Sequence, residues 1–233
     1  MDNEKHSRCE NCIIRQMNNF KALKKEELKQ MSDSKETKAI KKGEPIFKEG
    51  ERLNGVFCVR NGISKLSKMS DNGRDQIVKL ATKGEVLGQR SVIASQSTNL
   101  SATALEDMEV CFIPKKHILD SLQNNPAFTN AVLKRMANDL KLADDIIVHM
   151  AQKSVRQRIA EVLLYLDENF GEDKDGYLYL QLARADIADV VGTATELCIR
   201  TLTKLKKENI ISTNGKRIKL QDKKALSNIV EGL

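Results

Sequence analysis

The sequence predicts an α+β fold in which an antiparallel β-roll is followed by a long helix and a small C-terminal domain with a helix-turn-helix. Three observations support this prediction. Short β-rich runs separated by glycines fill residues 37–114, a helical pattern without Gly or Pro covers residues 127–152, and two short amphipathic patterns meet at Gly192. Many closely spaced short strands indicate a sandwich or barrel, and two helices joined by a short turn are typical of a helix-turn-helix.

Composition bounds the class of protein. The chain has 233 residues, of which 40% are hydrophobic and 30% charged, so it can hold one or two globular domains with a substantial core. No apolar run approaches the roughly 18–20 residues of a membrane span, and the N-terminus lacks a signal-peptide pattern. We therefore expect a cytoplasmic protein without membrane contact, whose five cysteines are thiols or metal ligands rather than disulfides.

Residues 1–35 are predicted to form a polar arm that contains a Cys-x-x-Cys pair, Cys9 and Cys12. A helical pattern follows over residues 18–31. A single Cys-x-x-Cys pair is a weak signal, because it can bind a metal, form a redox couple or have no function. All three interpretations stay open at this point.

Residues 36–125 are predicted to form the β-roll, whose interior can take a small ligand. Asp71-Asn72-Gly73 between two alternating runs is a hairpin signal. Residues 115–125 predict a short helix that leads to Pro126, a residue favoured at the first position of a helix.

Residues 126–152 are predicted to form a dimerisation helix. Apolar residues recur along it at alternating spacings of three and four, which is the pattern of a coiled-coil seam. Two copies can bury their seams against each other. A protein that binds a two-fold-symmetric DNA site needs two such copies. The alternative is packing on the β-roll, for which Ile146 and Val148 are available. The predicted dimer contacts are Leu133, Met136, Leu140, Ala143, Ile147 and Met150.

Residues 153–233 are predicted to form a winged helix-turn-helix. An amphipathic helix and a β segment over residues 177–182 lead into a first short helix, which Gly192 ends as a residue that tolerates a tight turn. Thr193 and Glu196 stand in capping-box spacing for the second helix.

A wing follows the second helix of this domain. Asn214-Gly215 between two short runs predicts a β-hairpin, and residues 223–230 predict a closing helix. Between residues 195 and 224, nine Lys or Arg stand against three acidic residues. Basic side chains gathered on one helix and the next hairpin are typical of phosphate binding.

The second helix carries side chains suited to reading DNA bases. Glu196 and Arg200 are four residues apart and therefore project from one stripe of the helix. Arg can donate to O6 and N7 of guanine together, and Glu can accept from N4 of cytosine. The alternative is a surface salt bridge between the two, but the turn and the basic hairpin favour DNA reading. The predicted DNA contacts are Thr195, Glu196, Ile199, Arg200, Lys204, Lys216 and Arg217.

This order of a β-roll, a long helix and a winged helix resembles the CRP/FNR family of bacterial transcription regulators over about residues 9–225. The resemblance is most specific in the β-roll glycines, EVCFIP, SVRQRIAEVLLYL and RADIADVVGTATELCIRTLTKLKK. It implies a sequence-specific DNA-binding regulator rather than an enzyme, with a sensor domain like the cyclic-nucleotide-binding domain, a cupin-type jelly roll. The implied partners are double-stranded DNA, a second copy of the chain and RNA polymerase.

The resemblance also bears on the operator. Glu196 and Arg200 match the base-reading ExxxR pair of the family, which implies a TGA-like core in each half-site. Ile199 occupies the position where the FNR branch usually has Ser, so the outer base of the half-site is not implied. Oxygen-responsive relatives carry an Asp on the helix seam where this chain has Ala143. We therefore expect a dimer with or without a cofactor.

Cyclic-nucleotide members of the family bind the cyclic phosphate with an Arg and the ribose with a Glu. The aligned stretches here are Gly88-Gln89-Arg90-Ser91 and Asn99-Leu100-Ser101-Ala102. Without the Arg, a buried phosphate would be unpaired, which costs several kcal/mol. We predict no tight cAMP binding.

The FNR branch instead carries an iron–sulfur cluster on four cysteines. By resemblance, Cys9 and Cys12 match the first two and Cys111 matches the distant one, but the remaining position falls at Asn18. Because four thiolates are the usual set, three interpretations of these cysteines stay open: a cluster or other metal site, a thiol redox switch, or a structural vestige. Cys58, like Cys198, is expected to be a small buried hydrophobe.

Two other classes of function compete with a regulator. A cupin-type enzyme needs clustered His and carboxylate ligands, and residues 37–114 contain no His. A nonspecific architectural DNA-binding protein would need more concentrated basic charge than this chain of net charge +7 carries.

Overall fold

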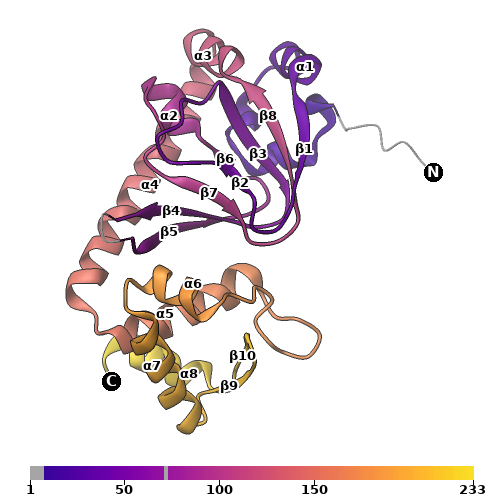
Figure 1. Cartoon of the computed structure of the whole chain (residues 1–233). Coiled ribbons are helices and arrows are strands. Elements are labelled where there is room, and N and C mark those ends of the chain that lie inside the picture. The colour runs from indigo at the N-terminus through magenta and orange to yellow at the C-terminus, as the bar shows by residue number, and fades with distance from the viewer. Residues whose placement is uncertain (1–7, 71–72) are drawn as a thin grey trace. The chain divides into compact units, whose positions relative to one another are not determined.

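The computed structural model describes residues 8–70 and 73–233 (Figure 1). The chain divides into two compact units, one made of residues 1–70 and 77–140 and the other of residues 71–76 and 141–233. Each unit is described by itself. Among the described residues, no helix combines the length and the apolar character that a transmembrane span requires.

Two four-stranded sheets form the predicted β-roll of the first unit (Figure 1). One sheet has the order β1-β8-β3-β6 and the other β2-β7-β4-β5. The predicted hairpin residues Asp71 and Asn72 lie outside the described residues, but β4 and β5 on either side of them are neighbours. The strands are β1 (Glu36–Ile40), β2 (Pro45–Phe47), β3 (Gly55–Asn61), β4 (Ser64–Met69), β5 (Asp75–Ala81), β6 (Val86–Leu87), β7 (Ser101–Ala104) and β8 (Met108–Pro114).

The two faces of the β1-β8-β3-β6 sheet bury different groups. Because successive side chains of a strand point to opposite faces, Phe57 and Val59 of β3 join the core cluster that also contains Phe47 of β2. Val56 and Cys58 point the other way, into a cluster with the N-terminal arm and Phe128. The arm therefore covers the second face of this sheet.

The N-terminal arm is less regular than predicted. It forms three 3-10 turns, η1 (Cys9–Asn11), η2 (Ile13–Met17) and η3 (Asn19–Ala22), before α1 (Lys25–Ser34) begins. The single helix predicted over residues 18–31 is wrong. The Asn18 side chain accepts a hydrogen bond from the Phe20 N–H at 2.9 Å, and the Glu27 carboxylate accepts one from the Lys24 N–H at 2.7 Å. These side chains cap two separate turns, which breaks the helix between them.

Helix α2 (Gln89–Ala94) follows β6, and α3 (Lys115–Asn124) leads into α4 (Pro126–Gln152), which begins at Pro126 as predicted. Phe128 and Val132 are buried and anchor the start of α4. The Arg135 Nη2 atom lies 2.7 Å from both carboxylate oxygens of Glu85, which also receives the Lys79 ammonium at 2.9 Å. This network fixes α4 to the turn before β6.

The second unit is a winged helix domain. Its helix α5 (Val155–Phe170) begins with a capping box at Ser154 and packs against all three of the domain's other helices. Buried Leu163, Leu205 and Leu226 belong to its core. The remaining elements are α6 (Arg184–Val191), α7 (Thr195–Lys207), β9 (Ile211–Asn214), β10 (Arg217–Leu220) and α8 (Lys223–Glu231).

Two predictions for this domain are wrong in detail. Residues 177–182 are not a strand, because their pairing is limited to an isolated bridge between Glu172 and Leu178 and one bond from Leu178 to the wing. The wing turn is Gly215-Lys216 rather than Asn214-Gly215, since Asn214 pairs with Arg217. Gly215 takes the positive φ of 57° that the turn requires.

Candidate nucleic-acid interface and thiol cavity

The turn between α6 and α7 is closed by backbone hydrogen bonds rather than by the predicted capping box. Gly192 has a left-handed φ of 70°, and the Thr193 N–H donates to the Ala188 carbonyl at 3.0 Å. Thr193 therefore belongs to the end of α6, and the N-cap of α7 is Ala194, which makes no side-chain cap. The capping-box prediction is wrong, and the Glu196 carboxylate has no partner among the described residues.

Arg158 of α5 holds this turn in place, a role that sequence reasoning missed. Its guanidinium donates to the carbonyls of Val191 at 2.9 Å and Lys153 at 2.9 Å, and more weakly to those of Met150 and Gly192. The ends of α4 and α6 are thus attached to one side chain. A basic residue in an amphipathic helix gives no sequence signal of such a role, because surface arginines occur there equally.

Helix α7 has one buried and one exposed face. Glu196, Arg200 and Lys204 are exposed, and Ile199 is 46% exposed between them. Thr195 is half-buried at the start of the helix. The surface salt bridge between Glu196 and Arg200 is absent from the described part of the chain. The side chains that anchor the other face are Cys198, Thr201, Leu202 and Leu205.

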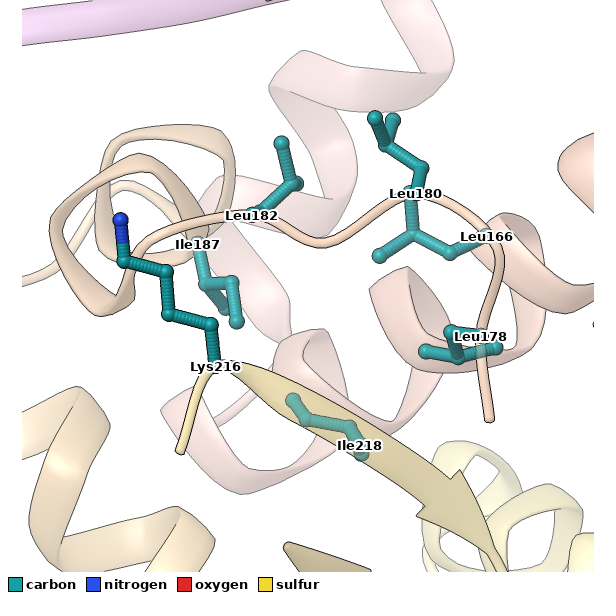
Figure 2. A pocket seen from close by; sticks show the side chains of 7 residues that line it. All are labelled: Leu166, Leu178, Leu180, Leu182, Ile187, Lys216 and Ile218. Atoms are coloured by element: carbon teal, nitrogen blue, oxygen red, sulfur yellow. The ribbon is translucent and has the colours of Figure 1, made fainter. Parts of the chain in front are cut away.

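The wing is fixed to the body of the domain at its turn. Arg184 of α6 donates to the carbonyls of Gly215 at 3.0 Å and Lys216 at 3.3 Å. Figure 2 shows Lys216 with its ammonium group pointing away from Ile218, which faces the leucines of the core. Lys216 is exposed, so its charge is presented to solvent at a turn that Arg184 holds by hydrogen bonds.

Arg217, the other predicted wing contact, is half-buried and pairs with acidic residues of its own domain. Its Nη2 atom lies 2.8 Å from Asp173 and 2.7 Å from Asp175, and its guanidinium stacks 4.0 Å from the Tyr177 ring centre. The hydrogen bond from Arg217 lowers the pKa of the Asp173 carboxyl below its usual value. Two carboxylates thus balance the charge of Arg217.

The predicted dimer seam on α4 is mostly open. Leu140 is 64% and Ile147 66% exposed, and Leu133 and Ala143 are also exposed. Met136 packs partly on the core of the first unit, and Met150 lies beside Gly192. Ile146 and Val148, the residues named for the alternative packing on the β-roll, are 46% and 47% exposed.

A cavity of about 30 Å³ lies between the N-terminal arm and the sheet of the first unit. Cys9, Cys12 and Cys111, which the resemblance singles out, line it together with Cys58. Burial raises the pKa of the Cys58 thiol to about 12, helped by Cys111 nearby. Burial also raises the pKa of Cys9 and Cys111, an effect that the Lys35 charge partly offsets.

The four thiols of the cavity are not arranged as the coordination sphere of a metal ion. Within residues 8–70 and 73–233, no group of three or more Cys, His, Asp or Glu side chains is arranged to hold a metal ion as it stands. The side chains around the cavity must therefore turn toward a common point if they bind one.

Comparisons with known proteins agree with both units. The family profile described as "Cyclic nucleotide-binding domain" matches residues 37–125, and "Crp-like helix-turn-helix domain" matches residues 157–229. The electron transport regulator A of Shewanella oneidensis is 32% identical over 90% of this chain and 84% of its own length. The anaerobic regulatory protein of Pasteurella multocida is 30% identical, covering 94% of this chain and 81% of its own.

Solved structures show the same fold. A transcriptional regulator of the CRP/FNR family from Eubacterium rectale superposes with a TM-score of 0.77 at 20% identity, covering 91% of this chain and 97% of that chain. FixK2 from Bradyrhizobium japonicum gives a TM-score of 0.73 at 25% identity, covering 84% and 96%.

A β-roll joined to a winged helix whose second helix exposes a polar, basic face defines a DNA-binding transcription regulator. The relatives that cover most of the chain place it more narrowly. The chain belongs to the CRP/FNR family.

Proposed function

We propose that the protein acts in the cytoplasm as a homodimer that reads a two-fold-symmetric DNA site through Glu196 and Arg200. The exposed face of α7 carries this proposal, because a base-reading donor and acceptor stand there four residues apart with no bond to each other. In a helix-turn-helix the second helix enters the major groove, and the two helices of a dimer contact half-sites about 34–36 Å apart. The proposed half-site has a TGA-like core.

The dimer is proposed to form through α4. Leu140 and Ile147 expose large apolar side chains seven residues apart on one stripe of the helix, which is costly unless a partner covers them. Ala143 between them adds no charge, so the proposed dimer does not depend on a cofactor. We propose RNA polymerase as a further partner, on the support of the family membership alone.

The signal is proposed to act on the thiol cavity rather than on a nucleotide pocket. Arg90 donates to Asn99 at 2.6 Å. The stretch Asn99-Leu100-Ser101-Ala102, which the resemblance aligns with the Arg-Ser of cyclic-nucleotide members, contains no Arg, so we expect no tight cAMP binding. Cys9, Cys12 and Cys111 are proposed metal ligands, because soft thiolates suit iron–sulfur clusters and zinc. A bound iron–sulfur cluster would supply sensitivity to oxidants, in keeping with relatives named anaerobic regulatory proteins.

Selection of binding sites from random DNA tests the DNA-reading proposal. We expect an inverted repeat whose half-sites are separated by one helical turn, and a marked preference for it over scrambled DNA of the same length at fixed salt. Protection of both half-sites by one dimer in a footprint would support the proposal. Equal affinity for selected and scrambled DNA, or recovery of a single half-site, would contradict it.

Lys216 provides a test of the wing. Lys216→Ala should weaken binding to all sequences about equally and lower the slope of log affinity against log salt by about one per subunit, because one phosphate contact is lost. Fluorescence anisotropy titrations at several salt concentrations measure this. Lys29→Ala, an exposed lysine of α1 in the first unit, is the matched control and should leave the slope unchanged. An unchanged slope for Lys216→Ala would show that Lys216 makes no phosphate contact and would contradict a role of the wing in DNA binding.

A further inference from the structure

The thiol cavity, lined by Cys9, Cys12, Cys58 and Cys111, holds one cysteine in addition to the three that the family resemblance matches. Cys58 lies on β3 directly opposite Cys111 on β8 in the strand register. Residues directly opposite in an antiparallel pair have Cβ atoms about 4.5–5.5 Å apart on the same face of the sheet. Cys9 and Cys12 of the arm line the same cavity from the other side. Four of the chain's five cysteines therefore meet at one place, and Cys198 belongs to the other unit.

Asn18 stands at the position where the resemblance expects the fourth thiol, and its side chain contacts Cys58. Its Nδ2 amide donates to the Cys58 sulfur at 3.5 Å and to the Gly84 carbonyl at 3.1 Å. Its Oδ1 atom accepts from the Phe20 N–H, which fixes the orientation of the amide. A hydrogen bond from an amide to a sulfur ligand stabilises the thiolate and tunes a metal centre.

Three basic side chains surround the thiols. Arg15, Lys35 and Arg60 line the same cavity. Four thiolates that hold a metal carry net negative charge, and nearby cations offset it. The positive charge along the wall is therefore compatible with a four-thiolate centre, and Arg60 also pairs with the Glu109 carboxylate.

We propose that Cys58 is the fourth thiolate of a metal centre formed with Cys9, Cys12 and Cys111, and that Asn18 is the hydrogen-bond donor to the Cys58 sulfur. The proposal rests on the metal site of the proposed function and adds its missing ligand from a β-strand rather than from the arm. The centre is an iron–sulfur cluster or a tetrahedral zinc site, since both take four thiolates. On coordination each thiol releases its proton to solvent and its sulfur bonds the metal.

Metal binding by the full-length protein tests this assignment. Protein purified without oxygen is reconstituted either with ferrous iron and sulfide or with zinc alone, and metal and sulfide per chain are then measured with the visible absorption spectrum. Wild-type protein should retain one centre per chain after a chelator wash. Cys58→Ala and Cys58→Ser should each lose more than about 90% of it, because a three-thiolate site is open to exchange. The iron and zinc arms identify the metal.

Two controls separate a ligand role from a folding role. Cys198→Ala removes another buried thiol and should bind metal like the wild type. Circular dichroism and the Tm of the metal-free proteins verify that the Cys58 variants fold. Asn18→Ala should keep the centre but lose metal about 10–100-fold faster than wild type, as expected for a residue that supports a ligand.

The outcomes distinguish this inference from the proposal on which it rests. Wild-type protein that binds neither iron nor zinc would overturn the metal site as a whole. Cys58→Ala or folded Cys58→Ser protein that retains metal and sulfide at the wild-type level would overturn the assignment of Cys58 alone. Loss of the centre in both variants, with retention in Cys198→Ala, supports it.

Discussion

Arg200→Ala is expected to reduce sharply the discrimination between the selected operator and scrambled DNA. The guanidinium is exposed on α7 and has no partner within the described residues. Loss of a bidentate contact to guanine costs roughly 1–3 kcal/mol per half-site. For two half-sites the affinity should fall by about 30-fold to 10⁴-fold, since each 1.4 kcal/mol is a factor of ten. Anisotropy titrations with operator and scrambled duplexes at one salt concentration measure both affinities.

Affinity for scrambled DNA should change far less in the same variant, because it depends on total charge rather than on base contacts. Arg52→Ala, which removes an exposed arginine of the first unit, is the matched control and should leave both affinities near the wild type. If Arg200→Ala kept the operator footprint and its specificity ratio, the assignment of α7 as the base-reading helix would fail.

The double variant Leu140→Asp, Ile147→Asp is expected to convert the dimer into monomers. Both side chains are about two-thirds exposed in the single chain, at 64% and 66%, so the change should cost little within a subunit. In a dimer it would bury four carboxylates without partners, which costs several kcal/mol per ion. Sedimentation equilibrium should show loss of association, and operator binding should fall with it, because a monomer contacts one half-site.

Leu142→Asp is the control for the seam. Leu142 is 58% exposed on α4 but does not belong to the predicted seam. The same change there should leave the dimer intact. Dissociation by Leu142→Asp to the same extent as by the double variant would show that the interface uses a different stripe of α4.

Much of the fold could be predicted because its signals are local. Pro126 marks the start of α4, Ser154 caps α5, and Gly192 separates the helices of the DNA-binding motif. The N-terminal arm could not be predicted in detail, because Asn18 and Glu27 cap separate turns where the apolar spacing alone favours one helix.

The candidate site also contains residues that could be placed from the sequence and residues that could not. The exposed face of α7 follows from helical periodicity, so Glu196 and Arg200 could be placed on it from spacing. The position of Cys58 depends on the order of strands in the sheet, because β3 and β8 are far apart in the sequence and become neighbours only when folded. The pairing of Arg217 with Asp173 likewise depends on how the loop that carries Asp173 and Asp175 packs on the wing.

The contact between Glu85 and Arg135 connects the thiol cavity to helix α4. Gly84 accepts a hydrogen bond from Asn18, and the adjacent Glu85 grips Arg135 with both carboxylate oxygens. The bend at Gly84 and Glu85 is thus bonded to Asn18, which contacts Cys58, and to Arg135 of α4. We expect any displacement of Asn18 by chemistry at the Cys58 sulfur to move this bend and, through Arg135, the proposed dimer helix α4.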